Sequence, residues 1–371
     1  MPRDLPAIEY LLAEATQAGA SDLHLKVGVP PTLRVNGQLQ PTAHRALSAD
    51  DTERYLDRLL PERLKVGFKE TSEADFAVDD VSPRRVRVNA FRQRGLVSIA
   101  LRPVPAPGMT FEDLGLPAAL GRLVQEPRGL ILVTGPTGSG KSTTLASIID
   151  RINSERNEHI VTIEDPIEYL HPHKGCLVNQ REVGADTSSF ACALKYILRQ
   201  DPDVVLIGEM LDLETIEAAL TVAETGHLAF ATLHTNSCVQ TINRIVDVFP
   251  PYQQAQVRAQ LSFVLEGVLS QTLIARSNGP GRVLALEIMV PNPAIRNLIR
   301  EDKIHQIYSQ MQIGQDKFGM QTMNQSLASL FQRRMISMDD AVGRSSDVEE
   351  LRQLIGGGGG AVVARRLASA S

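Results

Sequence analysis

The sequence predicts an α/β protein with two domains, a large one built on a parallel sheet and a smaller N-terminal α+β domain. A short apolar run, Leu130–Val133, precedes the glycine-rich stretch Gly135–Ser142, and Thr143–Asp150 follows with apolar residues at helical spacing. Strand, loop and helix therefore succeed one another. From Thr110 onward strands and helices alternate, which indicates a parallel sheet covered on both faces. The stretch Pro103–Gly108 contains three prolines in six residues and marks the domain boundary.

These features divide the 371 residues into four segments. We expect a small domain over 1–102, a linker over 103–109, the large domain with its C-terminal helices over 110–355, and a tail over 356–371. Five successive glycines open the tail, and glycine-rich chains are flexible. The tail is therefore expected to be disordered.

The composition is that of an ordinary globular protein, with 43% hydrophobic and 22% charged residues. A net charge of −5 and the absence of tryptophan argue against nucleic-acid binding, which relies on basic patches and aromatic stacking. The three cysteines lie far apart, so a zinc ribbon and a disulfide framework are both disfavoured. The N-terminus lacks the pattern of a signal peptide, and no apolar run approaches the length of a membrane span. We expect a cytoplasmic protein that meets a membrane only through a partner.

In the N-terminal domain, the spacing of apolar residues predicts helices and antiparallel strands. A first helix carries Ile8, Leu11 and Leu12 on one face. A hairpin is expected to turn at Asn36-Gly37. A second helix covers Asp50–Leu60, with Asp50 or Asp51 as its cap. Further strands are predicted over Ala20–Leu25, Ala74–Val78, Val86–Phe91 and Val97–Leu101.

The end of this domain is rich in arginine. These residues form either a solvated strand face or a set of which some point at a nucleotide bound elsewhere. They are Arg84, Arg85, Arg87, Arg92, Arg94 and Arg102.

In the large domain, three apolar runs end in an acid or a histidine: Ile160–Glu164, Val204–Glu209 and Leu228–His234. Because ligands bind at the carboxyl ends of parallel strands, these terminal residues are expected to face the glycine-rich loop. Helices are predicted over Leu213–Ala223, from Asn292-Pro293 with Arg296 and Arg300 on its outer side, over Gln321–Arg333, and over Met338–Ile355.

The loop has the spacing GxxxxGK[ST], whose glycines let successive backbone N–H groups surround a phosphate at the start of a helix. Lys141 would reach the β- and γ-phosphates, and the Ser142 hydroxyl would hold Mg²⁺. ATP is the expected ligand, and the residues expected to bind it here are Gly135, Pro136, Thr137, Gly138, Ser139, Gly140, Lys141, Ser142 and Thr143.

Acidic residues and histidines at the strand ends are candidates for the chemistry. Glu164 and Asp165 stand just before Pro166, where a carboxylate could deprotonate an attacking water, although an ordinary acidic loop would look the same. Glu209 ends a run with the Walker B layout and would hold Mg²⁺ or share the base role. His227 and His234 bracket the third strand, either as phosphate contacts or as structural histidines.

Several motifs, in this order, resemble those of the secretion-superfamily hexameric ATPases. They are the glycine-rich loop, TIEDPIE from Thr162 to Glu168, NQREVG from Asn179 to Gly184, LRQDPDVVLIGEM from Leu198 to Met210, AETGHLAFATLHT from Ala223 to Thr235, and INRIVDVFP from Ile242 to Pro250. Within that group, AIRNLIRE (Ala294–Glu301) and KFGMQTMNQSL (Lys317–Leu327) are similar to the type IV pilus retraction ATPases, the PilT family. The resemblance extends from about Ala20 to Ile355.

This resemblance implies a PAS-like N-terminal domain, a RecA-like ATPase core and a homohexameric ring. It implies an acidic box of Glu164, Asp165 and Glu168, with Glu164 as the base, and Glu209 as the Walker B acid. A histidine box would run from Gly226 to His234. Arginines of the N-terminal domain would reach the nucleotide, and Arg87, Arg94 and Arg102 are the nearest matches.

The function implied is an ATP-hydrolysing motor that powers type IV pilus retraction and twitching motility from the cytoplasmic side of the inner membrane. Its expected partners are the inner-membrane pilus platform protein and the rest of the pilus machinery, and an accessory retraction ATPase is a further candidate. The helix with Arg296 and Arg300 is either a coupling or docking surface or a solvated amphipathic helix.

Four alternatives stay open. The first two are an accessory retraction ATPase of the PilU type and an assembly or type II secretion ATPase, although the long extra N-terminal domain and four-cysteine zinc insertion of the latter are missing. The others are a RecA-like DNA translocase and a nucleotide-binding ring without turnover. The chain departs from the family in Leu211, which replaces an arginine, and in its long glycine-rich tail.

Overall fold

The computed structural model describes residues 5–35, 37–79, 81–82, 85–104 and 108–356. Contacts divide the chain into two compact units, and the boundary falls after residue 106, inside the stretch predicted as a linker. Glu168–Leu170 group with the first unit by their contacts. Asn36, Arg84, part of the linker and almost all of the predicted tail lie outside the described residues.

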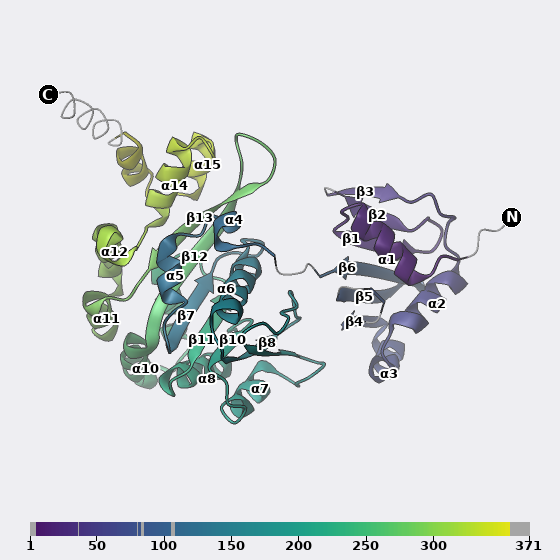
Figure 1. The fold of residues 1–371 in the computed structure, drawn as a ribbon, viewed down its shortest axis with the longest axis horizontal. Coiled ribbons are helices and arrows are strands. Elements are labelled where there is room, and N and C mark those ends of the chain that lie inside the picture. The colour runs from purple at the N-terminus through teal and green to yellow at the C-terminus, as the bar shows by residue number, and fades with distance from the viewer. Residues whose placement is uncertain (1–4, 36, 80, 83–84, 105–107, 357–371) are drawn as a thin grey trace. The chain divides into compact units, whose positions relative to one another are not determined.

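The first unit is a six-stranded antiparallel sheet in the order β3-β2-β1-β6-β5-β4, with three helices (Figure 1). Alternate residues of its strands, such as Leu23, Val88 and Ile99, are buried in one cluster with apolar residues of the helices. The elements are α1 (Ile8–Gln17), β1 (Asp22–Lys26), β2 (Thr32–Val35), β3 (Gln38–Pro41), α2 (Ala49–Leu59), α3 (Glu62–Thr71), β4 (Glu73–Val78), β5 (Val86–Gln93) and β6 (Leu96–Pro103).

Two local predictions can be compared with this unit. Val35 pairs with Gln38, so the predicted hairpin is present, with its turn where Asn36 lies outside the described residues. The cap predicted for α2, Asp50 or Asp51, was wrong by two or three residues. Ser48 is the N-cap, and Asp51 closes a reciprocal capping box by accepting from the Ser48 backbone N–H at 2.8 Å.

The second unit contains a seven-stranded sheet in the order β13-β12-β7-β11-β10-β8-β9. All neighbouring strands are parallel except β12 and β13, which form an antiparallel edge. The predicted parallel sheet is therefore confirmed, while β9, β12 and β13 were not predicted. The strands are β7 (Gly129–Thr134), β8 (His159–Glu164), β9 (Leu177–Glu182), β10 (Val204–Ile207), β11 (Leu228–Leu233), β12 (Leu265–Ala275) and β13 (Arg282–Met289).

Helices cover both faces of this sheet (Figure 1). Ile131, Val133 and Phe230 face a core shared with α4 (Phe111–Leu114), α5 (Ala118–Leu123) and α6 (Lys141–Glu155). Residues of the opposite parity, such as Leu130 and Leu132, face a core shared with Ile307 and Met311 of the C-terminal region and with five other helices. Those helices are α7 (Phe190–Ile197), α8 (Leu213–Glu224), α9 (Cys238–Asp247), α10 (Pro251–Val264) and α11 (Pro293–Arg300).

The C-terminal helices pack partly on the outer edge of the sheet. Ile274 and Ala285 of the β12–β13 hairpin share a buried cluster with residues of α14 and α15, such as Leu327. The helix predicted over Met338–Ile355 is broken, because Asp347 accepts from two backbone N–H groups and starts a new helix over 348–356. The remaining elements are η1 (Ile304–Gln306), α12 (Ile307–Ile313), α13 (Gln315–Phe318), α14 (Met323–Gln332) and α15 (Met338–Arg344).

None of the helices among the described residues has the length and apolar character needed to cross a membrane.

The capping box of α2 leads to a test of stability against pH. The Arg45 guanidinium donates to the buried Asp51 carboxylate at 3.0 Å, and this bond, followed by those from Ser48, holds the pKa of Asp51 well below its usual range despite burial. The fold therefore stabilises the ionised carboxylate. This contribution is complete above the unfolded-state pKa of about 4 and is lost as the pH falls through it toward the lowered folded pKa.

We expect Asp51→Asn to lower the free energy of unfolding by about 1–2 kcal/mol at pH 7, and by less at pH 3. Asp50→Asn is the matched control, because Asp50 stands exposed in the same helical turn. Thermal unfolding followed by circular dichroism at both pH values measures the difference. A deficit for Asp51→Asn that is the same at pH 3 and pH 7 would contradict this account.

Candidate active site

The glycine-rich loop follows β7 and lies between the carboxyl ends of β11 and β12 in the strand order. Gly135, Gly138 and Gly140 all have positive φ values, of 142°, 77° and 91°, which favour glycine. A Cβ atom on Gly135 would also clash with the backbone oxygen of Gln271 from β12. Gly140 is the N-cap of α6, so the loop leads directly into the positive end of a 15-residue helix. The predicted strand, loop and helix are confirmed.

Lys141 folds back over its own loop. Its ammonium donates to the backbone oxygens of Gly135 at 2.8 Å and Pro136 at 3.2 Å, and it lies 3.5 Å from Nδ1 of His234. Partial burial lowers the pKa of Lys141, and the Glu209 carboxylate partly opposes this shift. The Lys141 ammonium thus lies against the loop, close to His234 and Glu209, which follow β11 and β10.

Glu209 and His234 are in direct contact at the ends of β10 and β11. His234 Nε2 lies 2.6 Å from Glu209 Oε1, and both side chains are partly exposed. Together with Lys141, these two side chains form a row of polar groups that extends from the loop past the end of β11 to the end of β10. The prediction that these strand ends meet at the loop is confirmed for both residues.

Glu164 ends β8, the next strand along, and is only 9% exposed. Its Oε1 accepts from Thr162 Oγ1 at 2.7 Å and from Gln180 Nε2 at 3.1 Å. The Gly208 N–H donates to the Ile163 oxygen at 2.8 Å, which keeps the ends of β8 and β10 together. A buried carboxylate with two neutral donors is thus held in a fixed orientation, while Asp165 beside it is exposed.

His227 does not reach this site, and its prediction as a nucleotide contact was wrong. In the parallel register Leu228 pairs with Gly129, the first residue of β7, whereas the loop follows the last residue. His227 therefore stands at the opposite edge of the sheet. Its Nδ1 lies 3.1 Å from Thr225 Oγ1 and 3.2 Å from the Val222 oxygen, at the C-terminal end of α8. The rule that ligands bind at the carboxyl ends of parallel strands already favoured His234, which follows the strand, over His227, which precedes it.

The three candidate arginines of the first unit fall at two ends of one hairpin. Arg87 and Arg102 are directly paired across β5 and β6. Arg87 lies 3.4 Å from Glu168, which groups with the same unit, and Arg102 lies 2.8 Å from Asp22. Arg94 occupies the turn, which is about 20 Å along the strands from the other two.

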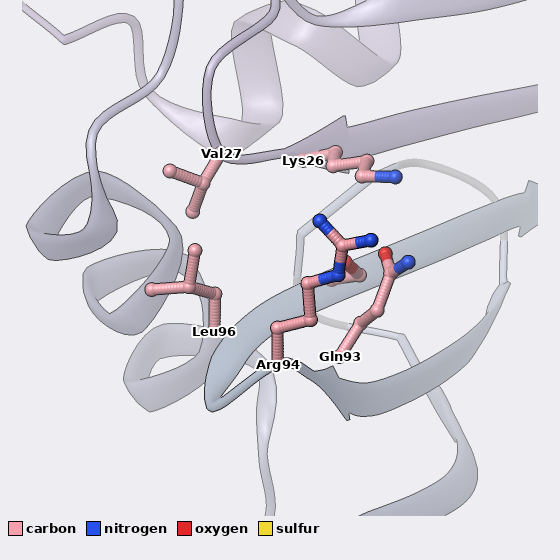
Figure 2. A pocket seen from close by; sticks show the side chains of 6 residues that line it. Lys26, Val27, Gln93, Arg94 and Leu96 are labelled. Atoms are coloured by element: carbon pink, nitrogen blue, oxygen red, sulfur yellow. The ribbon is translucent and has the colours of Figure 1, made fainter.

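Arg94 lines a pocket of about 200 Å³ at that end of the sheet (Figure 2). Its guanidinium points toward the same space as the Lys26 ammonium and the Gln93 amide, with Val27 and Leu96 on the other side. Arg94 has a φ of 52°, which a residue other than glycine rarely adopts. Arg94 is therefore separated from Arg87 and Arg102 along the hairpin, and the three candidate arginines do not form one cluster.

Three polar residues of the site were not predicted. Thr162 and Gln180 orient Glu164, and Gln271 donates to the Ser139 oxygen of the loop at 2.8 Å. Gln271 is only 1% exposed. No short-range signal marks it, because its neighbours Ser270 and Thr272 are polar as well, and only the pairing of β12 with β7 places it against the loop.

The expectation for Arg296 also needs correction, because it does not lie on the outer side of α11. Its guanidinium donates to the backbone oxygens of Ser262 and Phe263 at 3.0 Å and lies 2.8 Å from the Glu266 carboxylate. It therefore satisfies the last carbonyls of α10. Arg300, by contrast, lies 5.5 Å over the exposed Phe263 ring.

Comparisons with known proteins agree with this geometry. A family model described as type II/IV secretion system protein matches residues 5–336. The type IV pilus retraction ATPase PilT of Pseudomonas aeruginosa is 49% identical over 334 residues, covering 90% of this chain and 96% of that protein. The type IV pilus ATPase PilU of the same organism is 40% identical over 347 residues, covering 94% and 91%. The crystal structure of the pilus retraction motor PilT with bound ADP matches with a TM-score of 0.88 at 49% identity, covering 94% of this chain and 99% of that one.

The contacts of α11 yield a paired prediction. Burial raises the pKa of Glu266 and Arg296 lowers it, so removing the guanidinium leaves a half-buried carboxylate and two helix carbonyls without this partner. We expect Arg296→Ala to lower the free energy of unfolding by about 2 kcal/mol. Arg300→Ala should cost less than about 1 kcal/mol, because it loses only a partly exposed cation–π contact. Urea unfolding measures both, and equal losses would contradict the assignment.

Proposed function

The chain belongs to the family of type II/IV secretion system proteins, and we propose that it is a P-loop ATPase that powers the retraction of type IV pili. The observation that carries this proposal is the phosphate loop with Lys141, flanked by carboxylates at the ends of two neighbouring strands. The P. aeruginosa retraction ATPase aligns with this chain over 96% of its own length, and the crystal structure of the pilus retraction motor PilT with bound ADP has the same fold. The motor would act on the cytoplasmic side of the inner membrane through the pilus platform protein and would drive twitching motility.

In the proposed reaction, Glu164 orients and deprotonates the water that attacks the γ-phosphate. Its burial and its two neutral donors favour a single carboxylate orientation, which suits a base that must aim a water. Lys141 and the N–H groups of residues 135–143 would bind the phosphates, with the N-terminal end of α6 adding its dipole. His234, beside both Lys141 and Glu209, would sense the γ-phosphate.

Mg²⁺ is expected to accompany ATP, and hard oxygen donors suited to it are present. The Ser142 hydroxyl is exposed at the first turn of α6, and the Glu209 carboxylate is partly exposed beside Lys141. These two residues would hold the ion, and the ion would neutralise charge on the phosphates.

Arg87 and Arg102 are the proposed arginines that reach a nucleotide on a neighbouring copy in a homohexamer. Their pairing across β5 and β6 places the two side chains on the same face of the sheet. An arginine supplied in this way contributes roughly 10³–10⁵ in rate, which would make hydrolysis depend on assembly. Arg94, at the far end of the hairpin, is left out of this proposal.

A PilU-type accessory ATPase is the second candidate, and the 40% identity to PilU keeps it in the same family. The higher identity to the P. aeruginosa retraction ATPase favours the main proposal. Leu211, in place of the family arginine, is 59% exposed, and nothing in the structure gives it a role.

Substitutions at the loop and at the proposed base should separate binding from turnover. We expect Glu164→Gln to retain ATP binding and to lower kcat by about 10²–10⁴-fold, because the isosteric amide cannot accept a proton. Lys141→Ala should weaken nucleotide binding itself. Glu155→Gln, on the surface end of α6, is the matched control and should behave like the wild type. Fluorescent-nucleotide binding and phosphate release measure the two steps, and full turnover by Glu164→Gln would remove Glu164 from the base role.

The motor proposal is tested by Mg²⁺-dependent ATP hydrolysis across a range of protein concentrations. Specific activity should rise with concentration, because sites completed by Arg87 and Arg102 of a neighbour form only in the assembled ring. Activity independent of concentration in a demonstrably monomeric sample would contradict this proposal. ATP binding without turnover at any concentration would instead favour the ring without turnover.

A further inference from the structure

Gln271 contacts the phosphate loop at several points from the side of β12. Its amide donates to the Ser139 oxygen at 2.8 Å. Its backbone oxygen occupies the space that a Cβ on Gly135 would need, and Nε2 lies 3.3 Å from the corresponding position on Gly140. One residue of a neighbouring strand thus borders the loop at its start, middle and end.

The strand that carries Gln271 is tied on its far side to the C-terminal helices. Gln271 pairs with Leu286 of β13. The Leu286 N–H donates to Ser326 Oγ of α14 at 3.0 Å, and the Leu286 oxygen accepts from Gln321 Nε2 at 2.6 Å. Ile288, two residues on, exchanges both backbone hydrogen bonds with Gln321. The outer edge of β13 is therefore hydrogen-bonded to Ser326 of α14 and to Gln321, which lies just before this helix.

The antiparallel register explains this arrangement. In such a pair, successive residues alternate between turning their backbone groups toward the partner strand and away from it. Because the Leu286 backbone turns outward to α14, the backbone of its partner Gln271 turns the other way, toward β7 and the loop. The strands β12 and β13, which are about 5 Å from each other, thus lie between the loop and α14.

We propose that Gln271 is a positioning residue of the phosphate loop and that it couples the loop to α14 through the β12–β13 pair. This inference rests on the proposed nucleotide binding at the loop. Ser139 Oγ and Gln271 Oε1 are buried without a hydrogen-bond partner among the described residues. A buried polar group without a hydrogen bond is energetically unfavourable, so a small movement that gives either atom a partner lowers the free energy. The position of the loop is therefore sensitive to the position of Gln271. Displacement of α14 would then change nucleotide affinity.

The first test replaces the amide at nearly constant size. Gln271→Leu should raise the Kd for ADP and the KM for ATP about three- to tenfold, the change expected of one lost hydrogen bond, and should change kcat less than about twofold. Gln260→Leu is the matched control, a glutamine on α10 whose amide bonds to Glu224 at the C-terminal end of α8, the end next to the sheet edge opposite the loop. The increase in Tm that ADP causes should shrink for Gln271→Leu alone. A purely structural role would lower Tm without changing this increase, and that result would overturn the proposal.

The second test acts at a distance and does not touch the loop. Ser326→Ala removes the hydroxyl that accepts from Leu286, and should raise the Kd for ADP about two- to threefold. Ser329→Ala, exposed on the same helix, should leave it unchanged. In the Gln271→Leu background, Ser326→Ala should add no further increase, because both changes act along one path. Full additivity, or no effect of Ser326→Ala, would overturn the coupling.

These outcomes can be told apart from failure of the proposed function. If the wild type binds ADP without hydrolysing ATP, the motor proposal fails, while the changes in the Kd for ADP still support the positioning role of Gln271. If Gln271→Leu does not fold, Ser326→Ala alone decides, since it leaves every residue of the loop in place.

Discussion

The close approach of three strand ends to one glycine-rich turn is the constraint on which the rest of the site depends. Gly135 has no room for a Cβ because the Gln271 backbone of β12 lies against it. On the other side of the loop, β11 brings His234 to within 3.5 Å of the Lys141 ammonium. The loop is thus fixed between two strands that lie far from it in the sequence. Each polar group of the site then follows from a strand end, as the parallel register requires.

This arrangement also distributes charge in a useful order. Lys141 and the N-terminal end of α6 provide the positive potential. Glu209 is paired with His234 close to Lys141, whereas Glu164 is buried one strand further away and is held by neutral donors. A buried carboxylate in a fixed orientation suits the acceptance of a proton from an oriented water, while the partly exposed Glu209 carboxylate is open to a cation. The two acids therefore have different environments for different tasks.

Local patterns predicted the central part of the fold because the signals there are short-range. The apolar runs before Gly135 and around Val204 and Leu228 became buried parallel strands, and the loop adopted the expected geometry. Edge elements were missed for the opposite reason. The strand Leu265–Ala275 follows α10 without a turn signal, and its partner Arg282–Met289 is defined only by pairing with it. The remaining wrong predictions concern residues whose position depends on how strands and helices pair.

Register is a long-range property, and it separated residues that the sequence had grouped by type. Arg94, Arg87 and Arg102 are arginines of the same short segment of the sequence. The hairpin register nevertheless places Arg94 at the turn and pairs the other two across the strands. His227 and His234 differ only in which end of β11 they occupy, and only the direction of the parallel sheet distinguishes them. Arg296 and Arg300 share a helix, yet the end of α10 selects one of them as its cap. Motifs and residue spacing identify candidate residues, whereas the pairing of strands and the packing of helices determine which of them lie at the site.

The antiparallel edge of the sheet has a consequence for how the C-terminal region is connected to the site. In an all-parallel sheet the last strand would be covered by its crossover helix, and its free edge would be unpaired. Here β13 reverses direction, and its free edge is satisfied by Gln321 and Ser326 instead. The C-terminal helices are therefore hydrogen-bonded extensions of the sheet, one strand pair away from the phosphate loop. The hydrogen bonds of this edge thus connect α14 to the strand pair that borders the loop, which is the connection that the proposed coupling requires.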